Sequence, residues 1–177
     1  MIVLAGAGGR RAAVRIGGSL CPYSAESRLE ASLPSSPSAK SFAKRISVEI
    51  ARNAGSMMPW SCLSVELRAY PTNSLRLVVP HTGSTRLAGI ECQGLLGRRM
   101  VLGLPLEFAQ GVLDEWMSLT APVSGSLTVI GSAYDPVNSA RNSYREAARL
   151  AMWVAVEIHE GNEIQQDRLS SFLVSAF

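Results

Sequence analysis

Histidine and cysteine are scarce in this 177-residue chain. The two histidines, His81 and His159, lie far apart, and the three cysteines are odd in number and widely spaced: Cys21, Cys62 and Cys92. Closely spaced cysteine and histidine ligands are typical of zinc sites, and an even set of cysteines is typical of a disulfide framework. We therefore expect neither kind of site. The simplest prediction is small, buried cysteines in a reducing cytoplasmic setting.

The sequence also lacks a phosphate-binding glycine loop, a long apolar run and a recognisable pair of catalytic carboxylates. No Walker A string is present, and "GAGGRR" at 6–11 lacks the G-x-G-x-x-G spacing of a dinucleotide loop. No apolar stretch approaches the roughly 20 residues that span a bilayer. These absences predict a protein without a nucleotide cofactor, without a membrane span and without enzymatic activity.

Lysine is rare, whereas arginine supplies fifteen of the seventeen cationic side chains. Residues 1–52 hold eight basic and three acidic residues, and the remainder holds nine basic and eleven acidic residues. Because arginine binds phosphate through a planar fork of donors, this composition is compatible with RNA contact. A bias in genomic base composition would give the same counts.

The first 40 residues predict a basic leader. No acidic residue precedes Glu26, and serine and proline are frequent over 32–40. The composition resembles that of an organelle transit peptide, and a flexible leader is the alternative interpretation. We expect this segment to pack little against a single domain at 41–177.

The middle of the chain predicts one helix and several strands. Phe42, Ile46 and Ile50 favour a helix over 41–55, although Ile46, Val48 and Ile50 also alternate as a strand would. Residues 61–70 and 74–80 alternate apolar and polar side chains and predict an antiparallel hairpin. Residues 85–94 and 95–103, which are interrupted by glycines, predict further strands.

The last third predicts a helix over 104–119, a strand over 126–134 and a long helix capped by Asn138 or Ser139. An alanine-rich apolar stripe follows one side of the long helix, and Trp153 is expected in the core between helix and sheet. Its opposite side carries a basic stripe: Arg141, Arg145 and Arg149. The fold expected is an α+β two-layer sandwich, with a largely antiparallel sheet and both later helices on one face.

Residues 102–155 resemble domain IV of the ribosomal translocase, elongation factor G. That family has a Gly-x-x-Pro-x-Glu-aromatic entry into its first helix, and this chain has "GLPLEF" at 103–108 with the proline one place early. The family then has a strand, a Gly-Ser-Tyr-His-x-Val-Asp-Ser turn and an alanine-rich helix; this chain has "GSAYDPVNSARNSYREAARLA". The matching residues are Gly131, Ser132, Tyr134, Val137, Ser139, Tyr144, Ala147, Ala148 and Ala151.

The resemblance implies the left-handed βαβ crossover of that domain and a turn whose counterpart meets ribosomal RNA. Two departures alter the turn, because Asp135 stands where the family has histidine and Asn138 stands for an acid. Without a Walker A string the motor function of the translocase cannot be carried over.

Two functions are therefore expected, from different classes. The first is a non-enzymatic, translation-related module that binds ribosomal or other RNA, and the second is a protein-interaction or structural module that kept the fold and lost the RNA contact. The residues expected to carry binding are Tyr134, Asp135, Pro136, Asn138, Ser139, Arg141 and Arg145. For the turn, a purely structural strand-to-helix corner is the alternative interpretation, and for the arginines it is a solvated helix face.

Overall fold

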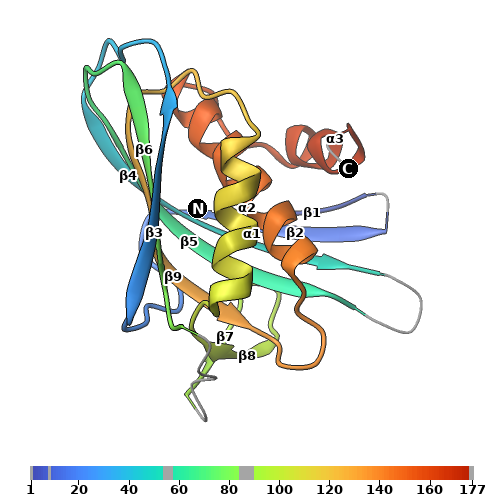
Figure 1. Cartoon of the computed structure of the whole chain (residues 1–177). Helices are drawn as coiled ribbons and strands as arrows, with labels where there is room; N and C mark the ends of the chain where they lie inside the picture. Colours follow the sequence, from blue (N-terminus) through green and yellow to red (C-terminus); the bar gives the residue numbers. More distant parts are fainter. Residues whose placement is uncertain (1, 8, 54–57, 84–89, 176–177) are drawn as a thin grey trace.

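A computed structural model describes residues 2–7, 9–53, 58–83 and 90–175, which form one mostly antiparallel sheet and three helices (Figure 1). The sheet runs in the order β1-β2-β4-β5-β9-β6-β3, and a hairpin of β7 and β8 joins it through β9. The strands are β1 Ile2–Ala7, β2 Arg10–Ile16, β3 Ser27–Pro34, β4 Phe42–Arg52, β5 Trp60–Ala69, β6 Ser74–His81, β7 Glu91–Gln93, β8 Arg99–Leu102 and β9 Gly125–Tyr134. The helices are α1 Leu106–Met117, α2 Arg141–His159 and α3 Gln166–Ser175.

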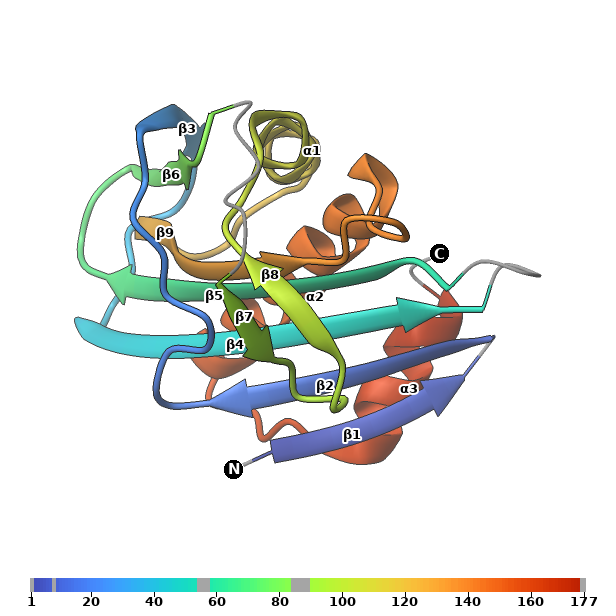
Figure 2. The same cartoon turned by 90° about the horizontal axis from the view of Figure 1, so that it is seen from below.

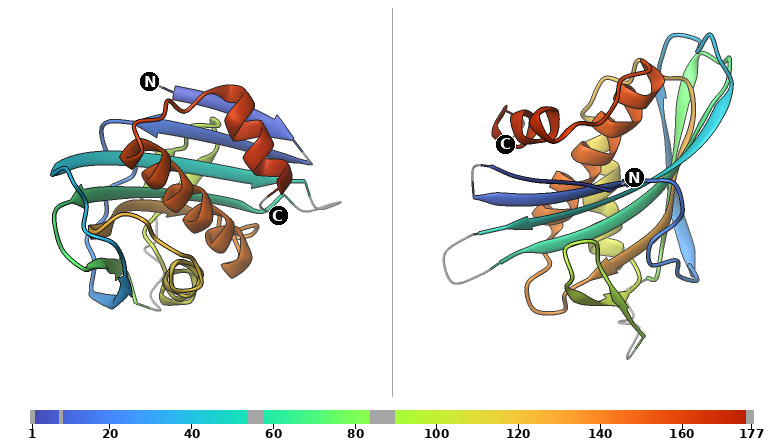
Figure 3. Two further views of the ribbon diagram at one scale, coloured as in Figure 1. Left: turned by 90° about the horizontal axis from the view of Figure 1, so that it is seen from above. Right: turned by 180° about the vertical axis from the view of Figure 1, so that it is seen from behind.

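The helices lie on one face of the sheet, as the left view of Figure 3 shows from above. Helix α2 covers the central strands β4 and β5, α1 lies over β6 and β3 toward one edge, and α3 lies over β1 at the other. The expected α+β class with helices on one face of a mostly antiparallel sheet is therefore confirmed. Strands β6 and β9 are parallel, and α1 lies between them in the chain. Among the described helices, none is long and apolar enough to cross a membrane.

The segment expected as a helix over 41–55 is strand β4, so this prediction was wrong over its described residues; Gly55, its expected end, lies outside them. Ile46, Val48 and Ile50 pack toward the helices, and the residues between them are buried on the other face. Phe42, Ile46 and Ile50 fit the period of a helix as well as Ile46, Val48 and Ile50 fit that of a strand, so the periodicity alone did not distinguish the two.

The hairpin expected from 61–70 and 74–80 does not form, although both segments are strands. Strand β9 lies between β5 and β6; it pairs antiparallel with β5 and parallel with β6. Strand β9 is rich in apolar residues, so the centre of the sheet buries both of its faces. Of the strands expected over 85–94 and 95–103, β7 and β8 are short, and residues 85–89 lie outside the described part.

The expectation that residues 1–40 pack little against the rest was also wrong. Strand β2 pairs along its whole length with β4, and β3 pairs with β6. Ala12, Ala13 and Val14 are buried. Small side chains such as alanine give a weak periodic signal, so the strand pattern was hidden by the arginines and glycines around it. The sheet thus runs across the boundary expected at residue 40.

The main core lies between the sheet and helices α1 and α2. Trp116 is fully buried there, and its indole N–H donates to the carbonyl of Ala148 at 2.9 Å. The expected alanine stripe of α2 faces the same core, since Ala147, Ala148 and Ala151 are fully buried. Small side chains let α2 lie close to the sheet and to α1.

Trp153 does not lie between helix and sheet, which corrects the prediction for this residue. It is half-buried and stacks on Phe172 of α3, with ring centroids 4.7 Å apart. The residue faces the side of α2 on which α3 lies, and α3 could not be placed from the sequence. The two histidines lie in different elements: His81 ends β6, and His159 lies in the last turn of α2.

The other face of the sheet is covered by the β7–β8 hairpin and by the segment after β2 (Figure 2). A smaller apolar cluster lies beneath them and includes Trp60, Cys62 and Met100. Cys21 and Cys92 form a disulfide that joins the two coverings, while Cys62 is a buried free thiol. The expectation that the cysteines form no disulfide was therefore wrong for Cys21 and Cys92. The prediction of a reducing compartment rested on that expectation and loses its support.

Candidate functional site

The turn expected to carry binding is a tight corner from β9 to α2. Its carboxylate and hydroxyl accept backbone hydrogen bonds: Oδ1 of Asp135 from the N–H groups of Val137 at 2.9 Å and Asn138 at 3.1 Å, and Oγ of Ser139 from the N–H of Asp135 at 2.8 Å. These bonds stabilise the chain reversal locally. The expected structural role of the turn is thereby confirmed at Asp135 and Ser139.

Neither expected capping residue occupies the N-cap of α2, because that position is Ala140. The side chain of Asn138 donates to Oδ2 of Asp135 at 3.1 Å, and the hydroxyl of Ser139 donates to the carbonyl of Trp60 at 2.5 Å. The side chain of Asn138 therefore stabilises the turn, and that of Ser139 links the turn to β5. The helix begins after Ala140, one residue later than a cap at Ser139 would give.

Asp135 is buried and paired. The guanidinium of Arg98, at the end of the β7–β8 turn, donates to Oδ2 at 3.1 and 2.5 Å. Burial by itself would raise the pKa of Asp135, but the hydrogen bonds from Val137, Asn138 and Arg98 together lower it below its ordinary value. The carboxylate of Asp135 therefore binds Arg98 and the backbone of its own turn.

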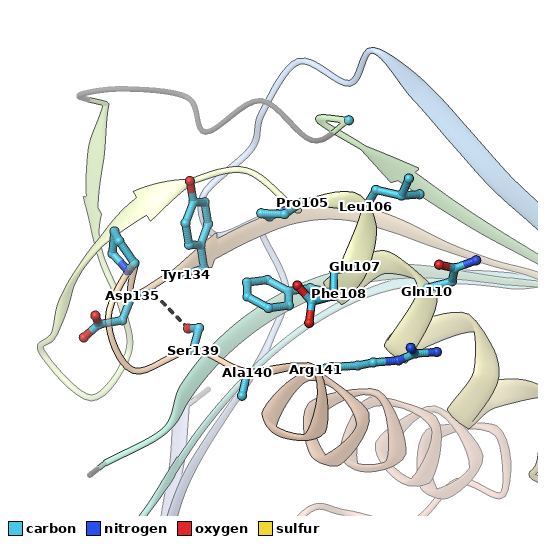
Figure 4. Close-up of a pocket in the computed structure, with 12 residues that line it drawn as sticks. Pro105, Leu106, Glu107, Phe108, Gln110, Tyr134, Asp135, Ser139, Ala140 and Arg141 are labelled. Carbon is cyan, nitrogen blue, oxygen red and sulfur yellow. Dashed lines mark hydrogen bonds between the residues drawn. The ribbon is translucent and has the colours of Figure 1, made fainter.

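A surface cleft of ≈ 660 Å³ lies beside the turn, between the starts of α1 and α2 (Figure 4). Phe108 forms part of its wall, stacked on Tyr144 at 4.8 Å and edge-on to Tyr134 at 6.0 Å. The cleft brings together five of the seven residues expected to bind: Tyr134, Asp135, Pro136, Ser139 and Arg141. Tyr134 is buried, whereas Pro136 is exposed.

The arginine stripe of α2 is paired with carboxylates of α1. Arg141 forms an ion pair with Asp114, and Arg145 and Arg149 pair with Glu115 at 3.0 and 2.5 Å. Glu115 is fully buried between the helices. Arg141 and Arg145 remain exposed, as a solvated face would be, but α1 supplies carboxylate partners that the helical spacing of α2 does not reveal.

Arg145 and Arg149 turn away from the cleft, toward two arginines at the ends of β2 and β4. Arg10 and Arg52 both approach the carboxylate of Glu146 on α2, at 3.6 and 3.3 Å. A surface hollow of ≈ 270 Å³ at this place is lined by Arg10, Arg52, Glu115, Asn142, Arg145, Glu146 and Arg149. We call these seven residues the arginine cluster. Its four arginines against two glutamates leave a formal net charge of +2.

Sequence reasoning missed Arg10 and Arg52 as partners of α2, because Arg52 and Glu146 are 94 positions apart. The basic excess in residues 1–52 was a signal of this surface, but it was assigned to a leader. The carboxylate of Glu49 was also missed, although a glutamate in the middle of an apolar strand is unusual.

Glu49 lies under the tip of the β7–β8 hairpin and is completely buried. The backbone N–H of Leu96 donates to its Oε2 at 2.9 Å, and Gly94 packs so closely that a Cβ there would collide with the carboxylate. Burial raises the pKa of Glu49 to about 7, and the backbone N–H groups of Leu96 and Leu95 and the charge of Arg11 limit the rise. The group is thus a buried acid that titrates near neutral pH.

Among the described residues, no three or more histidine, cysteine, aspartate or glutamate side chains are placed to hold a metal ion. The chain matches no protein-family model, no curated protein and no solved structure.

Proposed function

We propose that the protein is a non-enzymatic RNA-binding module that contacts phosphates through the arginine cluster. The contact lies beside the turn at 134–139 but does not depend on the charge of Asp135. The resemblance to domain IV of elongation factor G makes ribosomal RNA the first partner to consider. The proposal does not include motor activity.

The observation that carries this proposal is the convergence of four arginines from three elements. Arg10 comes from β2, Arg52 from β4, and Arg145 and Arg149 from α2. The side chains of Arg52 and Arg145 are 49% and 45% exposed, so their guanidinium groups can reach a phosphate while they remain near their glutamate partners. Arginine presents several N–H donors in one plane, which allows one group to bind a carboxylate and a phosphate oxygen together.

The arrangement around the turn supports the translation-related part of the proposal. The hydroxyl of Ser139 donates to the carbonyl of Trp60, so the start of β5 lies beside the 134–139 turn. In the family that residues 102–155 resemble, the counterpart of this turn meets ribosomal RNA. The arginine cluster lies next to the same end of α2, since Asn142 and Arg145 belong to its first turns.

A titration of labelled single-stranded RNA, followed by fluorescence anisotropy, tests this proposal. We expect the double variant Arg52→Gln/Arg145→Gln to bind at least about tenfold more weakly than the wild type at moderate salt. The variant Arg52→Lys/Arg145→Lys, which keeps both charges, should retain most of the affinity. Thermal unfolding checks that each variant is folded.

The matched control is Arg45→Gln/Arg68→Gln. These arginines also flank one glutamate, Glu66, and their side chains are 55% and 63% exposed. They lie near the other end of β4 and β5, on the opposite face of the sheet, so their loss should leave RNA binding nearly unchanged. Equal weakening by both double variants would show non-specific attraction, and an unchanged affinity of the Arg52/Arg145 variant would refute the site.

A protein-interaction module is the second candidate. It is favoured by the mixed charge of the cluster, in which every arginine stands near a carboxylate of the same surface. Such a surface matches a protein patch of mixed charge as well as it matches RNA. Absence of RNA binding in the wild type would make this the better account.

A further inference from the structure

The two edges of the sheet differ in how they are protected from pairing with another strand. The outer strand β3 carries Arg28 and Glu30, which form an exposed ion pair, and Glu30 also binds Arg76 of the neighbouring β6. Strand β3 ends in Pro34, which has no backbone N–H to donate. Charged side chains and proline are the usual means by which a sheet edge avoids further pairing.

Strand β1 at the opposite edge has neither device. Its residues, "IVLAGA", include no charge and no proline, and within the described part of the chain it pairs with β2 alone. Val3 and Ala5 pack toward the core, on the face that α3 covers. Ile2 and Leu4 point to the other face and are 55% and 53% exposed. Strand β1 lies at the edge of the sheet (Figure 2), so its outer row of backbone donors and acceptors is flanked by the exposed side chains of Ile2 and Leu4.

We propose that β1 pairs antiparallel with β1 of a second copy of this chain and so forms a symmetric dimer with a continuous sheet. A two-fold axis perpendicular to the sheet, passing beside Leu4, keeps the helices of both copies on the same side. In this register Leu4 lies opposite Leu4, Ile2 opposite Gly6, and Val3 opposite Ala5. Each residue then meets a residue that points to the same face.

The sequence of β1 fits itself in this arrangement. Its first half is bulky and its second half is small, so antiparallel pairing places a large side chain opposite a small one on each side of the axis. Since the strand carries no charge, a second copy brings no like charges together. A ladder of six residues buries less area than a standard protein interface, so the dimer should be weak and dependent on concentration.

Sedimentation velocity of the purified chain over a wide concentration range tests the proposal. We expect the wild type to pass from monomer to dimer, and Leu4→Glu to weaken the dimer at least about tenfold, because two carboxylates then face each other at the axis. Leu4→Lys should behave in the same way. An equimolar mixture of Leu4→Glu and Leu4→Lys should recover the dimer, since opposite charges then meet.

Val137→Glu is the matched control, because Val137 is an apolar residue that is 84% exposed but lies in the turn between β9 and α2. It should leave the dimer unchanged. If Leu4→Glu fails to fold by circular dichroism, Ile2→Glu replaces it and should also weaken the dimer, because the dimer places its charge in an apolar contact opposite Gly6 of the second copy. A wild type that stays monomeric, a dimer that survives Leu4→Glu, or assembly beyond the dimer would each overturn the proposal.

Discussion

The two faces of the sheet are covered in different ways. The helix face buries large apolar side chains such as Trp116 and Tyr144 under two long helices. The hairpin face, beneath β7–β8, buries Glu49, Ser47 and Ser64 beside a few apolar residues. The first face is therefore expected to provide most of the folding free energy, whereas the second depends on hydrogen bonds, one disulfide and the protonation of one acid.

The same difference separates the arginines by function. Arg10 and Arg52 project to the helix face, where they meet α2, whereas Arg45 and Arg68 project to the other face around Glu66. Arg45 and Arg52 thus belong to the same strand, β4, but point to opposite faces of the sheet, because successive side chains of a strand alternate between the faces. The hollow on the helix face gathers arginines from β2, β4 and α2.

The largest effect is expected from removing the central aromatic side chain of the helix face. Trp116→Ala leaves a large cavity and removes the hydrogen bond of the indole to the carbonyl of Ala148, and should lower the free energy of unfolding by roughly 3–5 kcal/mol. Urea unfolding followed by circular dichroism measures it. A loss below about 1 kcal/mol would mean that α1 does not hold the core.

Opening the disulfide should affect the hairpin face next most strongly. Cys21 and Cys92 are separated by 71 positions, and their link restricts the unfolded chain over that length. Replacing both by serine should cost about 2–4 kcal/mol relative to the oxidised protein, and a dithiol reductant should cost the wild type a similar amount. The Cys62→Ala variant serves as the control, because it must keep its sensitivity to reductant. A double-serine variant as stable as the oxidised wild type would contradict this role.

Glu49 should make the stability depend on pH with a defined sign. Its pKa in the folded protein is about 7, above the ordinary value of 4.5. Its neutral form therefore favours the fold at pH values below the ordinary pKa, and this stability is lost as the pH rises through about 7. Urea unfolding should show a loss of roughly 1–3 kcal/mol between about pH 5 and about pH 8.

Glu49→Gln, which cannot ionise, should remove most of that pH dependence. Urea unfolding of both proteins over the same pH interval makes the comparison. An unchanged pH profile in the Gln variant would assign the titration to another group.

Trp153 should give the smallest effect of the set. Its ring is half-buried and stacks on Phe172 at the edge of the core. Trp153→Ala should therefore cost about 1–2 kcal/mol, clearly less than Trp116→Ala. Urea unfolding of both variants compares the loss of unfolding free energy at a fully buried and at a half-buried tryptophan of the helices. An equal loss would contradict the account.

The parts of the fold with a strong, single period could be predicted from the sequence. Strand β5, helix α1, strand β9 and helix α2 were expected within a few residues of where they lie. Strand β4 was missed because its apolar residues fit the period of a helix as well as that of a strand. The N-terminal strands were missed because alanines, glycines and arginines hide their alternation. Trp153 was misplaced because α3, the element it contacts, could not be positioned.

The candidate site shows the same limit. The local turn chemistry of Asp135 and Ser139 follows from the residue types, whereas the pairing of Asp135 with Arg98 and of the arginine stripe with α1 depends on contacts between distant elements. The cluster with Arg10 and Arg52 required the sheet order β2-β4-β5. A row of charged residues on one side of a helix therefore predicts a binding surface only when the elements packed beside that helix are known.

The most direct test of the account is the salt dependence of RNA affinity. We expect the logarithm of the wild-type association constant to fall linearly with the logarithm of salt concentration, and the slope of Arg52→Gln/Arg145→Gln to be smaller by about one to two units, one for each lost phosphate contact. The slope of Arg45→Gln/Arg68→Gln should equal that of the wild type. A wild type without salt-dependent binding, or equal slopes for all three proteins, would contradict the assignment of RNA binding to the arginine cluster.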